Sequence, residues 1–173
     1  MRFKSRLFPL AAWLMSVVCS TVPDRGQAAA GDSAATAQHL VIIVHKSNPV
    51  ENLTRDELRR ILLFERGQWP NGRRHSVALL PAGAPERVAA LRTLCEFSES
   101  DYERHLLQLA YTGNLPARPK ELVSPANLRK FVFNVPGAIG CVRAADADDT
   151  VKVIRIDGHR PGEAGYPLQL LAK

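Results

Sequence analysis

The sequence predicts a single α/β domain in which short strands alternate with helices. Its 173 residues are close to the usual size of one domain. With 46% hydrophobic and 23% charged residues, the composition is that of a globular protein and excludes a disordered, collagen-like or disulfide-packed chain. Strand and helix patterns follow one another as strand, helix, strand, three helices, strand, strand. That order is typical of an α/β layer and not of a helical bundle or a β-sandwich.

The first half of the domain has three clear elements. Leu40–Val44 is a continuous, mostly β-branched run, which predicts a strand buried on both faces. Thr54 and Glu57 form a capping box, which begins a helix whose apolar stripe consists of Leu58, Ile61 and Leu62. Val77–Leu80 is the second predicted strand.

Start and stop residues predict three further helices. Pro85 suits the first position of one helix, with an inner face formed by Val88, Leu91, Leu94 and Cys95. Ser98 caps the next helix, which Gly113 ends. Ser124 and Pro125 begin the last helix, which stops at Pro136-Gly137. Two strands, Ala138–Val142 and Val151–Ile156, complete the domain.

Residues 1–30 have the pattern of a secretory signal peptide. A basic start is followed by the apolar run Leu7–Val18 and by the small residues Ala28-Ala29-Ala30. The run is shorter than the ~18 residues of a membrane span. We therefore expect a cleaved signal, a periplasmic protein without stable membrane insertion, a flexible leader over residues 31–39 and a domain over residues 40–170.

The charge of the chain does not predict nucleic-acid binding. The pI of 9.6 and the net charge of +6 suggest it at first. Loss of residues 1–30 would halve this excess, and export separates the protein from the genome. We expect no nucleic-acid partner.

No motif in the sequence predicts catalysis. A nucleophile elbow, a P-loop, a dinucleotide glycine motif and a zinc-protease helix motif are all missing, and the five histidines are dispersed. We therefore expect no enzyme, no catalytic residues, no metal and no cofactor. Two cysteines of the expected mature chain, Cys95 and Cys141, either form a disulfide in an oxidising compartment or are buried as small apolar side chains.

One segment predicts a ligand site. Leu80 to Arg87 carries a strand end directly into a helix, where ligands bind in open α/β sheets. Gly83 and Ala84 offer no side-chain cap, which leaves the first amides of the helix free for an anion near Arg87. The alternative is an ordinary loop whose amides face water, and the Glu86 carboxylate would compete with an anion for the helix start.

The order of several segments resembles the type 2 periplasmic binding protein-like domain of phosphate ABC transporter substrate-binding proteins. These segments are Val41–Pro49, Leu53–Leu58, Gln68–Gly72, Phe131–Val132, Pro136–Gly140, Val153–Gly158 and Tyr166–Leu168. The resemblance covers about residues 40–170. It implies a single truncated lobe with a small mixed sheet flanked by helices, and a non-enzymatic role in solute binding.

The resemblance leaves two functions open. The first is periplasmic binding of phosphate or another oxyanion at Gly83, Ala84, Glu86 and Arg87, in association with an ABC transporter. However, the family's Ser-Gly-Thr anion loop corresponds here to Ala82-Gly83-Ala84, which has no hydroxyls. The second function is therefore a secreted interaction module of the same fold that has lost its ligand and docks on an envelope protein.

Overall fold

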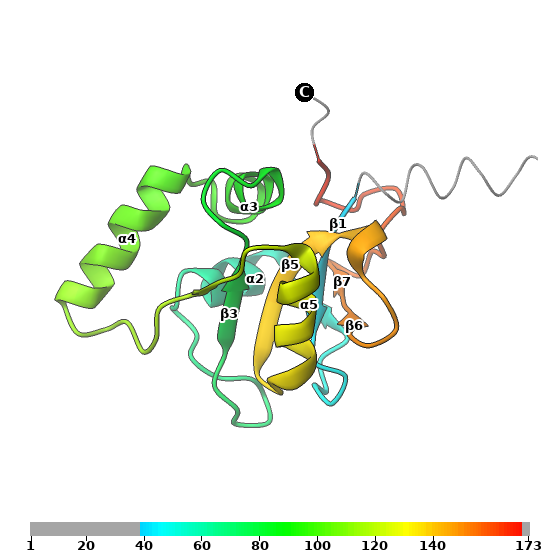
Figure 1. Ribbon diagram of the computed structural model, residues 1–173, viewed down its shortest axis with the longest axis horizontal. Coiled ribbons are helices and arrows are strands. Elements are labelled where there is room, and N and C mark those ends of the chain that lie inside the picture. The colour runs from blue at the N-terminus through cyan, green and yellow to red at the C-terminus, as the bar shows by residue number, and fades with distance from the viewer. Residues whose placement is uncertain (1–38, 171–173) are drawn as a thin grey trace, which may run out of the picture.

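A five-stranded mixed sheet lies at the centre of the protein (Figure 1). The computed structural model describes residues 39–170. The strand order is β4 (Lys120–Glu121), β3 (Ser76–Leu79), β5 (Ala138–Arg143), β1 (Leu40–Val44) and β6 (Lys152–Val153). The predicted α/β class is confirmed. The predicted signal peptide and all of the predicted leader except His39 lie outside the described residues.

The strand directions bring three strand ends to one edge of the sheet. β3 runs parallel to both β4 and β5, whereas β1 runs antiparallel to β5 and to β6. The carboxyl ends of β3, β4 and β5 therefore lie side by side. The ligand site predicted from the sequence follows β3 at this edge.

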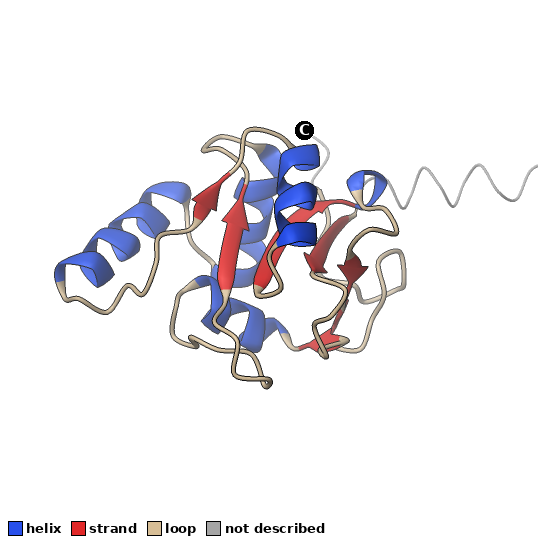
Figure 2. Cartoon of the chain, turned by 60° about the horizontal axis from the view of Figure 1, so that its bottom comes forward, coloured by secondary structure: helices blue, strands red, loops and turns tan. Residues whose placement is uncertain are grey.

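Helices cover both faces of the sheet, so β1 is buried on both sides, as predicted (Figure 2). On one face, α5 (Pro125–Asn134) packs Leu128 and Val132 against the strands. On the other face lie α2 (Arg55–Leu62) and α3 (Pro85–Ala90), which continues as a π-helix over Leu91–Cys95. No described helix has the length and apolar character needed to cross a membrane.

The predicted helix starts are confirmed in detail. Thr54 and Glu57 form the reciprocal capping box of α2. Ser98 caps α4 (Glu99–Tyr111), and Ser124 caps α5. Each cap satisfies an amide that has no partner within its own helix.

The prediction of one strand over Val151–Ile156 is wrong. The chain turns at the buried Ile154, so that β6 joins the main sheet while β7 (Arg155–Ile156) pairs in parallel with β2 (Asn52–Leu53). β2 and β4 were not predicted, because a strand of two residues has no recognisable alternation.

Of the two alternatives for Cys95 and Cys141, the disulfide is not formed. Both cysteines are free and buried among apolar side chains.

The loop before β3 contains a half-buried histidine, His75. The Nδ1 of His75 donates to the carbonyl oxygen of Arg66 at 2.8 Å, and its ring lies edge-on to Trp69 with centroids 4.5 Å apart. Nε2 is buried and has no hydrogen-bond partner among the described residues. Burial lowers the pKa of His75, and the nearby Arg66 charge lowers it further, although the hydrogen bond to the Arg66 carbonyl raises it.

We therefore expect His75 to make the fold less stable in mild acid. Because the pKa is lower in the folded than in the unfolded state, the unfolded chain takes up the proton first, and stability falls as the pH drops through about 6.5. The fall ends below the lowered pKa of the folded state. Urea unfolding of the wild-type chain and of His75→Gln between pH 8 and pH 5 measures this. The stability advantage of the wild type over the variant should shrink with acid, and a constant difference would contradict the assignment.

Candidate functional site

The candidate site lies at the carboxyl edge of the sheet, in the loop between β3 and α3. Gly83 has a positive φ of 84°, which lets the chain turn sharply into the helix. Ala84 is the N-cap of α3 and supplies no side-chain hydrogen bond, as the sequence predicted. Its own amide closes the turn by donating to the carbonyl oxygen of Pro81 at 3.1 Å.

A carboxylate from α4 accepts hydrogen bonds from a backbone amide of this loop. The N–H of Gly83 donates to both carboxylate oxygens of Glu99, each at 3.0 Å. Glu99 is the first residue of α4, and the Ser98 cap fixes its position. One Glu99 oxygen also lies 3.3 Å from Nε of Arg87. The chain therefore places its own oxyanion between the loop amide and the arginine.

Arg87 is the electrostatic centre of the site. It is only 2% exposed, and its guanidinium lies 2.7 Å from carboxylate oxygens of both Glu103 and Glu121. It also donates to the carbonyl oxygen of Leu80 at 3.2 Å. Burial acts to lower the pKa of Arg87, but the three neighbouring carboxylates outweigh it and raise this pKa. With Glu99, three acidic groups surround one cation, so the cluster carries an excess of negative charge.

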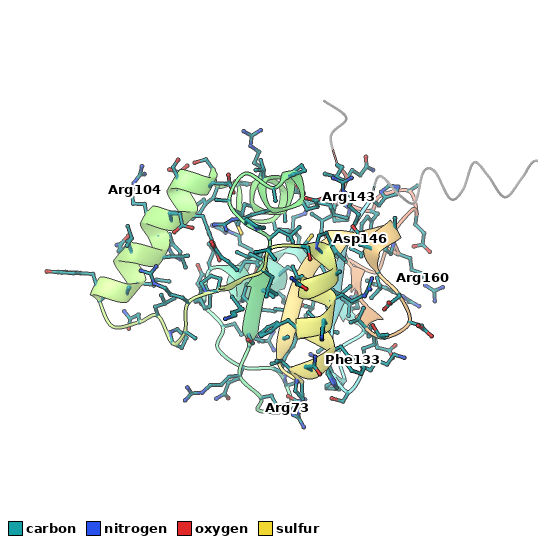
Figure 3. The ribbon with its side chains drawn as sticks, in the orientation of Figure 1. Arg73, Arg104, Phe133, Arg143, Asp146 and Arg160 are labelled. Atoms are coloured by element: carbon teal, nitrogen blue, oxygen red, sulfur yellow. The ribbon has the colours of Figure 1, made fainter. Side chains whose placement is uncertain are left out.

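Glu86 does not join this cluster. Its carboxylate is buried and pairs with Nε of Arg143, at the end of β5. Figure 3 shows Arg143 beside α3, at the same edge of the sheet. The structure therefore brings Gly83 and Arg87 together around Glu99 and directs Glu86 to a separate ion pair.

A cavity of about 550 Å³ opens beside the cluster. Both basic and acidic side chains line it. The lining residues are Arg87, Glu103, Leu106, Arg118, Pro119, Lys120 and Glu121. Within residues 39–170, no group of three or more histidine, cysteine, aspartate or glutamate side chains is placed to hold a metal ion.

Sequence reasoning missed the three glutamates that complete the site. Glu99 and Glu103 are four residues apart on α4 and therefore share a helix face, which was a usable signal. Glu121 comes from β4, a strand too short to be recognised. None of the three could be assigned to Arg87 without knowing that α4 packs beside the end of β3.

Comparison with solved structures identifies the fold. An ABC-type phosphate transport receptor from Vibrio cholerae matches with a TM-score of 0.58 and 20% identity, covering 71% of this chain and 48% of the receptor. PstS from Borrelia burgdorferi matches with a TM-score of 0.57 and 13% identity, covering 71% of this chain and 49% of PstS. The fold is that of a periplasmic binding protein-like domain.

This confirms the resemblance seen in the sequence at the level of the fold. The chain spans about half the length of these binding proteins, which fits the predicted single lobe with a small mixed sheet. No family model matches the chain, and no curated protein matches it in sequence.

Proposed function

We propose that this chain is a non-enzymatic periplasmic binding protein-like domain that acts through contacts with another envelope protein. One observation favours an interaction role over solute capture: the Glu99 carboxylate is bound by the Gly83 amide and lies against Arg87. Gly83 and Arg87 are two of the residues at which the sequence predicted a free oxyanion. The signal-like pattern of residues 1–30 supports export to the periplasm.

The electrostatics of the cluster oppose capture of phosphate. A phosphate dianion would have to displace Glu99 and would then meet Glu103 and Glu121, with only Arg87 as a buried cation. Micromolar affinity requires about 8 kcal/mol of binding free energy. Two or three charge-assisted hydrogen bonds supply about 3–9 kcal/mol before the costs of ordering and of displacing Glu99. Tight binding by this chain alone is therefore not expected.

A second candidate is weak binding of phosphate or a similar oxyanion at Gly83, Ala84 and Arg87, in association with an ABC transporter. The side chain of Glu99 is 27% exposed, so it can leave the loop without opening the core. The start of α3 has no side-chain cap that would replace it. Glu86 would take little part in this anion site, because its carboxylate is bound to Arg143.

Calorimetric titration with inorganic phosphate separates the two functions. We expect no heat of binding from the wild-type chain up to about 10 mM phosphate. This corresponds to a binding free energy of less than about 3 kcal/mol. Glu99→Ala frees the Gly83 amide and removes one negative charge, so this variant should gain binding in the millimolar range. Glu96→Ala is the matched control, because Glu96 is exposed just before α4 and should leave the titration unchanged.

The outcomes distinguish the candidates directly. Saturable heat from the wild type at any concentration up to about 10 mM phosphate would contradict the interaction proposal and support the second candidate. No gain in Glu99→Ala would show that Glu99 is not what excludes the anion.

A further inference from the structure

The end of the sheet opposite the candidate site is formed by the starts of β3 and β5 and by the end of β1. Ser76 is paired there with Ala138, and Val44 with Ile139. This end is the amino edge of the sheet. The segments that meet at it are residues 45–47 after β1, residues 71–74 before β3, and residues 130–137 between the last turn of α5 and β5.

The amino edge carries an excess of positive charge. Its three segments contain four basic residues and no acidic residue. The basic residues are Lys46, Arg73, Arg74 and Lys130, and all four are exposed. Within residues 39–170, every ion pair uses other basic side chains, so these four charges have no carboxylate partner.

An exposed aromatic ring lies among these charges. Phe133 is 50% exposed in the last turn of α5, three residues after Lys130 and therefore beside it on the helix. Figure 3 shows Phe133 and Arg73 at the same end of the protein, whereas Arg143 lies at the opposite end. The edge thus presents basic side chains together with one aromatic side chain.

We propose that the amino edge binds the surface of an anionic lipid bilayer, reversibly and without insertion. Anionic headgroups attract basic residues that lie near them, and an aromatic ring beside such residues enters the headgroup region. The charges are spread along the edge, because the ends of β1 and β3 lie on either side of β5, about 10 Å apart. Spread charges fit an extended anionic surface better than a single small anion.

The charges at the other end of the sheet determine the orientation on the bilayer. The carboxyl edge carries the carboxylates of Glu99, Glu103 and Glu121 around Arg87. An anionic surface repels this acidic cluster and attracts the amino edge. The candidate site therefore faces away from the bilayer, where it stays accessible to a protein partner.

Vesicle flotation tests the binding. The exported form of the chain is used, because the apolar run Leu7–Val18 would itself enter a bilayer. We expect binding to vesicles of equal parts phosphatidylglycerol and phosphatidylcholine, and none to phosphatidylcholine alone. Arg73→Gln with Arg74→Gln should lower the partition coefficient about twentyfold, the effect of removing two charges at the membrane surface. Arg59→Gln with Arg60→Gln is the matched control and should change it little, since these exposed neighbours lie on α2 and Arg59 is beside the π-helix.

The aromatic ring is tested in the same assay. Phe133→Ser should lower the partition coefficient severalfold. Val123→Ser removes an 81% exposed side chain just before the other end of α5 and should leave the coefficient unchanged. Equal losses from the two arginine pairs would show that only net charge matters and would overturn the assignment to the amino edge. Retention on immobilised polyglutamate without any vesicle binding would overturn the lipid proposal in favour of an acidic protein.

An environment-sensitive fluorophore tests the orientation, in a Cys19→Ser background. Cys95 and Cys141 stay unlabelled, because burial raises both thiol pKa values to about 12. A label on Asn134→Cys, at the amino edge, should shift its emission to the blue on anionic vesicles. A label on Ser100→Cys, in the first turn of α4, should not. A shift at Ser100→Cys and none at Asn134→Cys would overturn the orientation.

The lipid surface goes beyond the proposed function and shares no residue with the candidate site. Glu99→Ala should therefore leave vesicle binding unchanged. A wild-type chain that floats with neither kind of vesicle would overturn the lipid proposal and leave the phosphate titration as the separate test of the candidate site.

Discussion

Replacing Arg87 by methionine is expected to lower the free energy of unfolding by about 3 kcal/mol. Removing one member of a buried charge pair typically costs 3–5 kcal/mol, because the remaining charges lose their partner. Arg87 has three carboxylate partners, and they would be left to repel one another at the edge of the sheet. The carbonyl oxygen of Leu80 would also lose a donor. The loss should lie at the lower end of this range, because solvent screens the partly exposed glutamates.

Urea unfolding measures this change, with Arg104→Met as the matched control. Arg104 also pairs with an acid on α4, but both side chains are well exposed, so its loss should cost at most about 0.5 kcal/mol. Adding Glu103→Gln and Glu121→Gln to Arg87→Met removes the repulsion and should restore part of the lost stability. A loss below 1 kcal/mol in Arg87→Met would show that the cluster does not stabilise the fold.

The burial of Arg87 also shows where sequence reasoning reached its limit. Helical periodicity predicted Val88 on the inner face of its helix, yet Glu86 and Arg87 are buried and Val88 is only half-buried. The burial of a charged residue can be predicted only when the residues that pair with it are known. Here they come from α4 and β4, which are 12 to 34 residues further along the chain.

Local signals were read correctly wherever the interaction is itself local. The capping box of Thr54 and Glu57 is a contact within four residues, and the run Leu40–Val44 carries its apolar pattern within five. The structure confirms both. The division of residues 151–156 between two sheets depends on contacts more than 100 residues away, such as the bond from the Ile154 amide to the Ile42 carbonyl oxygen. No pattern inside a six-residue window contains that information.

Gly137→Ala is expected to be the other strongly destabilising substitution, with a loss of about 3 kcal/mol. A Cβ at this position would overlap the backbone carbonyl oxygen of Arg74, which no side-chain rotation can relieve. The two segments must approach closely here, because the amide of Ser76 donates to the carbonyl oxygen of Gly137 at 3.0 Å. The indole N–H of Trp69 donates to the same oxygen, also at 3.0 Å.

The size of this loss is set by the contacts that must shift. Overpacking in a well-packed region costs about 1–3 kcal/mol, and each weakened hydrogen bond adds about 1 kcal/mol. Gly67→Ala is the matched control, since a Cβ there meets no atom within 4 Å and Gly67 has no positive φ. It should be neutral or slightly stabilising, because alanine restricts the unfolded chain. Equal urea midpoints for the two variants would show that the approach of Gly137 to Arg74 relaxes freely, and that the parallel start of β3 and β5 does not depend on this glycine.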